Sequence, residues 1–539
     1  MSKKIFYCDK IKTFCPEYPN IQAILVSDGR IEFMGTKDDV LTYIYIYIYI
    51  GKQQIEEIHL GEGVLYPGFI DTHSHCSIYS NLLDKVYCAP SCGNIPSILQ
   101  KLKEKADNTP EGEWVIGYSY DDTGIPEARH LNKHDLNAVS TRHPVLVSHI
   151  SSHMGYANDL ALQKFSFDAR TKIPGGEVVV DSQGQTTGFL LETAYFKCLS
   201  YLPAATPEQQ KENLKKTVYE YNKNGFTTIQ DGGLGFGTDA RLITQSYIQL
   251  YKENRLNARM YLQYVPEAFE KLLPYGLWNF GNDYITFGGL KYFTDGSIQG
   301  FTGALSQDYH SRPGYKGNLL YPQEEIDAMI EKYHCMNVQI AVHTNGDAAS
   351  EAVISAFEKA LKKNPRTDLR HMLVHAQMVS DSQLERMKAC GIIPTFFVKH
   401  VEVWGDRHAK IFLGPERMSR LDPCGSAAKI GLPFALHVDT PVLPVTALES
   451  MHTAVNRTSS SGIVYGENQR ISIKQALEAY TVNAALCCAG EKNRGRLKPG
   501  YYADFVLLDK DLEEIPSADI KNAQVLKTIC GGNIVYEKN

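Results

Sequence analysis

The stretch Pro67-Gly-Phe-Ile-Asp-Thr-His-Ser-His75 is an apolar run that ends in two histidines separated by one residue. Residues i and i+2 of a strand project from the same face, so we expect His73 and His75 to lie together where a strand ends. Two neutral imidazole nitrogens at one point can bind a metal ion. Because His-x-His pairs also occur as unrelated surface histidines, the rest of the chain must decide between the two interpretations.

Three later segments repeat the pattern of an apolar run that ends in a possible metal ligand. They are Val338-Gln-Ile-Ala-Val-His343, Met372-Leu-Val-His375 and Phe434-Ala-Leu-His-Val-Asp439. A fourth segment, residues 285–295, carries Lys291 where the others carry histidine or aspartate. In a barrel of parallel strands, the carboxyl ends of all strands open on one face. The pattern therefore predicts that these side chains converge although they are far apart in sequence.

This order of motifs, His-x-His, Lys, His, His and Asp, resembles the amidohydrolase superfamily. Residues 67–75, 291–297, 343–347 and 375–377 are similar to its YtcJ-like branch, also called amidohydrolase family 3, which includes N-substituted formamide deformylases. The resemblance covers nearly the whole chain. It implies an α/β fold, a distorted TIM (β/α)8 barrel with a small β-sandwich built from both termini and an inserted α+β subdomain after the first barrel strand.

Apolar runs and turn signals place the parts of this fold along the chain. The gap between the first two barrel strands is too long for one loop, and it has strand-like runs of its own at 114–118, 144–148 and 176–180. We therefore expect a lid subdomain there. The predicted parts are 1–65 and 485–539 for the sandwich, 66–76 and 223–484 for the barrel, and 77–222 for the lid. The predicted barrel strands are 66–73, 225–231, 257–265, 285–293, 337–343, 370–375, 391–398 and 433–439.

Composition narrows the class of protein. The chain is 43% hydrophobic and 22% charged, so it can bury a large core. Its 539 residues are more than one compact core usually holds. A net charge of −6 without a long basic run argues against a nucleic-acid partner, and no run is apolar enough to predict a membrane span. Twelve cysteines without a CxxC pair indicate reduced thiols, so we expect a cytoplasmic protein.

The resemblance implies a metal-ligand set. His73, His75 and Asp439 would hold one divalent ion, with zinc the preferred metal, and His343 with His375 would hold a second.

Lys291 would bridge the two ions after its amine has reacted with carbon dioxide. A carbamate supplies an anion, whereas an ammonium group would repel the metals. Alternatively, Lys291 is a lysine at the edge of the core or an ion-pair partner of Asp295, and the site then holds one metal.

Two residues are candidates for the chemistry itself. Asp439 can accept a proton from the attacking water and pass it to the leaving nitrogen. The family usually reads Gly-Ser-Asp here, whereas this chain has His437-Val-Asp439, which changes the floor of the pocket. His153 matches a family histidine that reaches into the pocket and could contact the substrate carbonyl oxygen, with a structural role as the alternative. The candidate substrate contacts are Trp114, Tyr120, Asp122 and Asp295.

The leading hypothesis is a metal-dependent hydrolase of carbon–nitrogen bonds other than peptide bonds. It would cleave small linear or cyclic amides, N-substituted formamides among them, with a metal-activated hydroxide and Asp439 as the proton shuttle. A mononuclear deaminase or esterase on the same frame, and a non-catalytic regulatory homologue, remain alternatives. A homodimer is one of the oligomeric states that the sequence leaves open.

The run Tyr43-Ile-Tyr-Ile-Tyr-Ile-Tyr-Ile50 has a strict period of two, which is typical of a strand. Residues 36–41 just before it start like a capped helix. We assign the repeat no function.

Overall fold

The computed structural model describes residues 3–47, 55–150, 154–173, 176–199, 201–278, 280–366, 368 and 370–538. The chain forms two compact units, one of residues 1–78 with 214–539 and one of residues 79–213. The boundary at 213/214 falls inside helix α7 (Pro207–Lys223).

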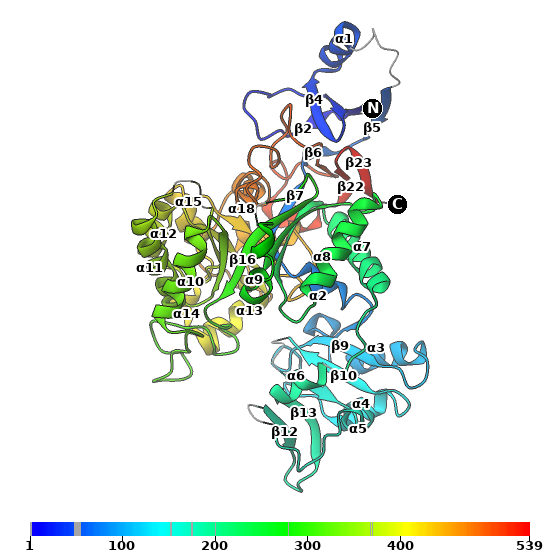
Figure 1. The fold of residues 1–539 in the computed structure, drawn as a ribbon, viewed down its shortest axis with the longest axis vertical. Coiled ribbons are helices and arrows are strands. Elements are labelled where there is room, and N and C mark those ends of the chain that lie inside the picture. The colour runs from blue at the N-terminus through cyan, green and yellow to red at the C-terminus, as the bar shows by residue number, and fades with distance from the viewer. Residues whose placement is uncertain are drawn as a thin grey trace. The chain divides into compact units, whose positions relative to one another are not determined.

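The larger unit is built around an eight-stranded parallel sheet that nearly closes into a barrel (Figure 1). Where the first and last strands meet, Thr72 Oγ1 donates to the carbonyl oxygen of Leu436 over 3.2 Å. The predicted barrel is thereby confirmed, and each predicted strand overlaps an observed one. The strands are β7 (Phe69–Ser74), β14 (Phe226–Leu234), β15 (Arg259–Tyr264), β16 (Ile285–Phe293), β17 (Gln339–Thr344), β18 (Met372–His375), β19 (Ile393–Phe396) and β20 (Ala435–Leu436).

The first barrel strand begins three residues later than the predicted start at 66. Tyr66 and Pro67 belong instead to β6 (Val64–Pro67), which pairs with β21 (Phe505–Leu508) near the C-terminal end of the chain. Gly68 separates β6 from β7, and a Cβ atom there would lie 2.3 Å from Thr227 Oγ1. Only glycine lets the chain pass this close to the neighbouring strand as it moves from one sheet to the other.

Helices follow the barrel strands and cover the outside of the sheet. In Figure 1, α10, α11 and α12 lie side by side against it, and α17 (Ile473–Tyr480) and α18 (Val482–Cys487) contact both β7 and β20. Within the described residues, no helix combines the length and the apolar character needed to cross a membrane. The helices that follow β14 to β20 are α8 (Ala240–Lys252), α9 (Pro266–Glu270), α10 (Gln323–Cys335), α11 (Asp347–Lys363), α12 (Asp381–Cys390), α13 (Lys399–Arg407) and α16 (Leu448–Asn456).

The two ends of the chain form the predicted β-sandwich. Phe6, Ile24 and Val26 of one sheet share a buried core with Phe505 and Ile529 of the other. Asp28 and Gly29 form a tight turn in the first sheet, and both have positive φ angles, 50° and 76°. The first sheet contains β1 (Lys3–Tyr7), β3 (Ala23–Ser27), β4 (Arg30–Gly35) and β5 (Ile55–His59), and the second β2 (Lys10–Ile11), β6, β21 (Phe505–Leu508), β22 (Val525–Cys530) and β23 (Asn533–Glu537).

The smaller unit is an α+β structure with one mixed sheet. The strand-like runs predicted at 114–118, 144–148 and 176–180 correspond to three of its strands. Its strands, in spatial order, are β12 (Gly176–Val180), β13 (Thr186–Glu192), β11 (Met154–Ala157), β10 (Val145–His149), β9 (Val115–Tyr120) and β8 (Val86–Tyr87). Its helices include α3 (Ile95–Asp107), α4 (Lys133–Val139), α5 (Asp159–Phe165) and α6 (Thr193–Leu199).

The strand interpretation of the Tyr-Ile repeat is wrong for residues 43–47, which lie in helix α1 (Lys37–Tyr47). Thr36 and Asp39 bond to each other's backbone amides, over 2.9 Å and 3.2 Å, and so start the helix. The Tyr43 ring then stacks on Phe33 at 4.3 Å. A helix start and one packing contact therefore outweigh the period of two. Residues 48–50 lie outside the described part of the chain.

Candidate metal centre

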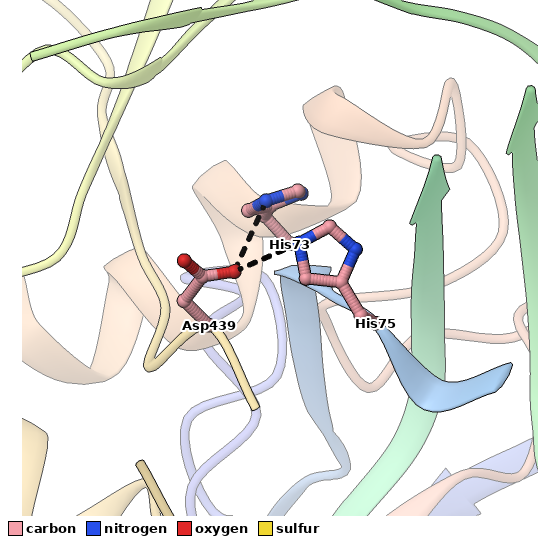
Figure 2. Close-up of side chains that lie close together, drawn as sticks. All are labelled: His73, His75 and Asp439. Atoms are coloured by element: carbon pink, nitrogen blue, oxygen red, sulfur yellow. Dashed lines mark ion pairs between the residues drawn. The ribbon is translucent and has the colours of Figure 1, made fainter. Parts of the chain in front are cut away.

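His73, His75 and Asp439 meet at the carboxyl end of the barrel (Figure 2). Oδ1 of Asp439 lies 3.2 Å from Nε2 of His73 and 3.3 Å from Nε2 of His75. His73 and Asp439 are buried, and His75 is only slightly exposed. Two imidazole nitrogens and one carboxylate oxygen thus surround one point, an arrangement that can hold a divalent metal ion.

His343 and His375 form a second pair at the same end of the barrel. Nδ1 of His343 lies 3.1 Å from Nε2 of His375, which is 3.9 Å from Oδ2 of Asp439. On its other side, Nε2 of His343 lies 3.3 Å from the carbonyl oxygen of Gly296. A carbonyl can only accept, so an Nε2–H donated there leaves the lone pair of Nδ1 directed at His375.

Lys291 is fully buried in β16, level with Ala341 of β17. No described group accepts a hydrogen bond from its amine, and the centroid of the Phe293 ring lies 4.6 Å from Nζ. Burial lowers the pKa of Lys291 to about 7, against the opposing charges of Asp439 and Asp295. A large share of this amine is therefore neutral at neutral pH.

The histidines have the protonation state that metal binding requires. Burial lowers the pKa of His73 and of His375 well below the ordinary value, and that of His343 to about 3, so all three are neutral. Both ring nitrogens of His73 and the amine of Lys291 are buried polar atoms without a hydrogen-bond partner among the described residues. Buried polar atoms are rarely left unsatisfied unless an ion or water completes them. This donor set fits a metal centre.

Two of these residues adopt a backbone conformation that few non-glycine residues use. The φ angle is 69° at His375 and 55° at Asp439. Such strain costs on the order of 1–3 kcal/mol per residue and is concentrated at functional sites. It turns both side chains toward the same point from strands that have just ended.

Asp295, predicted as a substrate contact, is fully buried and accepts three backbone N–H bonds. The donors are Ala304 at 2.9 Å, Asn345 at 3.0 Å and Gly346 at 2.8 Å. Burial raises the pKa of Asp295 to about 7 against these bonds. The carboxyl group thus fixes the loop that follows His343. Its predicted contact with substrate stays a prediction.

The other predicted substrate contacts lie in the smaller unit. Trp114 stacks on Phe165 with ring centroids 5.4 Å apart, and Tyr120 is fully buried and donates to the carbonyl oxygen of Arg129 over 2.7 Å. Their roles in substrate binding stay predictions. His153 lies outside the described residues.

Asp122 pairs with His149, whose Nε2 is 3.0 Å from Oδ1 of Asp122. Burial acts to raise the pKa of Asp122, but the hydrogen bond from His149 and the charge of His130 hold it below the ordinary value. With Asp121, this pair forms a second group that could hold a metal ion.

Sequence reasoning assigned no role to Asn345 or Gln377, and it placed His437 only at the floor of the pocket. Nδ2 of Asn345 donates over 2.8 Å to the carbonyl oxygen of Gly296, the same oxygen that accepts from Nε2 of His343, and it lies 3.1 Å from that nitrogen. Gln377 and His437 are buried with unpartnered side-chain nitrogens, and the ring of His437 lies 5.2 Å from that of His73. Each of the three lies two residues before or after a candidate metal ligand. This spacing is the sequence signal that could have identified them.

The chain matches known proteins over nearly its whole length. YtcJ of Bacillus subtilis (strain 168) is 29% identical over 545 residues, covering all of both chains. N-substituted formamide deformylase of Arthrobacter pascens is 25% identical over 539 residues, 96% of this chain and 95% of the deformylase. Among solved structures, an uncharacterized metal-dependent hydrolase of Pyrococcus horikoshii OT3 shares the fold with a TM-score of 0.78 at 23% identity, covering 96% of this chain and 99% of the other.

The model of the amidohydrolase family matches residues 56–536, from the sandwich strand β5 through the barrel to β23. The match spans every strand that carries a possible metal ligand. The chain is a hydrolase that belongs to the amidohydrolase family.

Proposed function

We propose that the protein hydrolyses the carbon–nitrogen bond of a small amide other than a peptide, with zinc as its metal. One observation carries this proposal: four histidines, a carboxylate and a buried lysine without a hydrogen-bond partner among the described residues lie at the carboxyl end of the barrel. N-substituted formamides are the first substrate class to test, because a relative of nearly equal length is named for that activity.

The residues divide into two sets of ligands. His73, His75 and Asp439 would hold one ion, and His343 with His375 the second. The bound metal supplies a Lewis acid and a water of lowered pKa, near 7 for zinc.

Lys291 would join the two sets as a carbamate. Its neutral amine adds to the carbon of carbon dioxide and releases one proton, so an anion replaces a neutral amine. Burial of Nζ without an internal partner supports this role, because the same atom as an ammonium group would be an unpaired buried charge.

Asp439 would carry the proton. Its Oδ1 atom faces His73 and His75, while its Oδ2 atom lies 3.9 Å from Nε2 of His375. The attacking water gives its proton to this carboxylate as its oxygen bonds to the carbonyl carbon. The carboxyl group then returns the proton to the departing nitrogen as the carbon–nitrogen bond breaks.

A panel of substrates separates this function from its alternatives. The zinc-loaded protein should be assayed against N-substituted formamides, acylated amino acids, lactams, hydantoins, aryl esters and amidines, with its metal content measured. We expect amide hydrolysis that stops on chelation and returns with zinc. Turnover of esters alone, or ammonia release from amidines with one metal per chain, would replace the proposal by an esterase or a deaminase. Absence of both metal and turnover would indicate a regulatory homologue.

A further inference from the structure

A cavity lies at the opposite end of the barrel from the candidate metal centre. Its volume is about 470 Å³, and its wall contains Tyr261, Thr286, Gln339 and His371. These residues stand near the amino ends of β15, β16 and β17 and just before β18, whereas the metal ligands stand at the carboxyl ends. The cavity is thus outside the catalytic site and has the size of a site for a small ligand.

Arg494 lines this cavity and is 9% exposed. Its Nε donates to Asn493 Oδ1 over 3.1 Å and its Nη1 to Thr228 Oγ1 over 3.3 Å, and both acceptors are neutral. In the described part of the chain, no carboxylate lies within ion-pair distance of this guanidinium group. A guanidinium group has five N–H donors and is always charged, so most of its capacity is left for a partner in the cavity.

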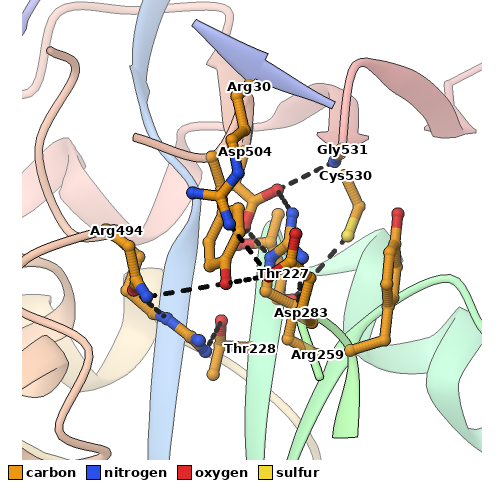
Figure 3. A network of polar contacts seen from close by, with 12 residues as sticks. Arg30, Thr227, Thr228, Arg259, Asp283, Arg494, Asp504, Cys530 and Gly531 are labelled. Carbon is orange, nitrogen blue, oxygen red and sulfur yellow. Dashed lines mark hydrogen bonds and ion pairs between the residues drawn. The ribbon is translucent and has the colours of Figure 1, made fainter. Parts of the chain in front are cut away.

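The neighbouring arginines each have a carboxylate of their own (Figure 3). Arg259 makes two bonds to Asp504, over 2.7 Å and 2.9 Å, and Arg30 pairs with Asp283 over 2.8 Å. Three guanidinium groups and two carboxylates leave one positive charge in this network, and it belongs to Arg494.

The other two arginines that line the cavity also have a carboxylate partner. Arg366 pairs with Asp368 over 3.1 Å, and Arg370 pairs with Glu491. The ring of Tyr502, 5.2 Å from Cζ of Arg494, gives only the weaker attraction of an aromatic face and is shared with Arg259 at 3.6 Å.

We propose that this cavity binds a small molecule through a carboxylate or phosphate group that pairs with Arg494. A buried cation without a counter-charge is costly, and a planar guanidinium group pairs with both kinds of oxyanion through two parallel bonds. The cavity is larger than the oxyanion, so it has room for the organic part of such a ligand.

Isothermal titration of the metal-loaded protein tests this at constant ionic strength set with sodium chloride. Inorganic phosphate and acetate are the two probes, and the tighter one identifies the class of oxyanion. We expect Arg494→Gln to weaken binding at least tenfold. Arg170→Gln, which removes an equal charge from a side chain 92% exposed in the other unit, should bind as the wild type does.

A second variant keeps the test independent of folding. Asn493→Asp places a carboxylate beside Nε of Arg494 without changing the size of the side chain. It should raise the melting temperature in the absence of oxyanion and abolish the response to phosphate and acetate. Binding of phosphate at the metal centre would be unchanged in both variants, which distinguishes it from binding in the cavity. Equal binding by wild type and Arg494→Gln, an unchanged response in Asn493→Asp, or no binding of either probe would overturn the proposal.

Discussion

The Nδ1 atom of His75 donates to the carbonyl oxygen of Gly232 over 2.6 Å, and its Nε2 therefore faces Asp439 with a free lone pair. The same glycine lies against the other histidine of the pair, because a Cβ atom at Gly232 would be 2.7 Å from Nδ1 of His73. One residue of β14 thus sets the orientation of both histidines of the first motif.

Gly232→Ala should therefore weaken metal binding. The added methyl group must displace His73, and loss of such an orienting contact typically costs about 10–100-fold in metal affinity. Metal dissociation measured by competition with a chelator checks this. Gly233→Ala is the matched control, because its Cβ atom would lie 3.7 Å from Cε1 of His75, an ordinary contact distance. Its φ of 84° adds backbone strain. Equal metal affinity in Gly232→Ala and wild type would contradict the assignment.

Asp439→Asn should lower kcat by about 10²–10⁴ if general acid–base catalysis carries its usual weight. The amide keeps the shape of the side chain but cannot take up the proton. Metal content must be measured on the same sample, since loss of a ligand would also lower the rate. A variant that keeps its metal and turns over near the wild-type rate from pH 5 to pH 9 would assign the proton transfer to another residue, with His153 the first to examine.

Lys291→Met should reduce the metal content from two ions per chain to one or none, because the bridging anion is lost. In the wild type, reactivation of metal-free protein should depend on bicarbonate. The pKa of Lys291 is lowered to about 7, so the neutral amine that reacts with carbon dioxide predominates above that pH and declines below it. Reactivation should therefore be faster at pH 8 than at pH 6. One metal per chain in a fully active wild type, with no response to bicarbonate, would exclude the bridge.

Asp504→Leu should destabilise the protein by about 3–5 kcal/mol, because it leaves Arg259 as a buried charge without its partner. Arg259 lies in the barrel strand β15 and Asp504 in the C-terminal sandwich segment, so the pair joins barrel and sandwich. The double variant Arg259→Met with Asp504→Leu should lose less than the sum of the single changes. Denaturant unfolding of the four proteins measures the coupling, and simple additivity would show that the pair contributes little.

Asp511→Asn should lower the melting temperature at pH 7 but not near pH 2. Burial acts to raise the pKa of Asp511, but bonds from Lys10, over 2.6 Å, and Lys12, over 3.1 Å, bring it down to about 2. Because the folded pKa lies below the ordinary 3.8, the stabilisation is complete above that pH and is lost as the pH falls toward 2. Thermal unfolding between pH 7 and pH 2 follows this. Asp519→Asn, without a described lysine or arginine partner, should show no such gap.

Much of the fold could be predicted because its signals are local. Each barrel strand is a short apolar run of its own, and the Asp28-Gly29 turn needs only residues that tolerate positive φ. The Tyr-Ile repeat shows the limit of prediction from local patterns. Its period of two predicted a strand, whereas the capped helix start just before it leads into a helix. The period of the repeat indicated a strand and the capping residues indicated a helix. The contact of Tyr43 with Phe33 favoured the helix.

The candidate ligands were also accessible from sequence, because a ligand residue at the end of an apolar run is a local pattern. Their geometry was not. Val374 is level with His343 across β17 and β18, so strict alternation would turn His375 to the other side of the sheet. Its φ of 69° brings the ring back toward His343.

By itself, the sequence determined the order of elements, the barrel with its sandwich, and which side chains reach one end of the barrel, because these follow from periodicity and from the residue at the end of each strand. Only the tertiary structure decided that Gly232 orients two histidines, that Asp295 holds three backbone amides, and that Arg494 is left without a counter-charge. Such pairings depend on distances between residues far apart in the chain, and no local pattern encodes them.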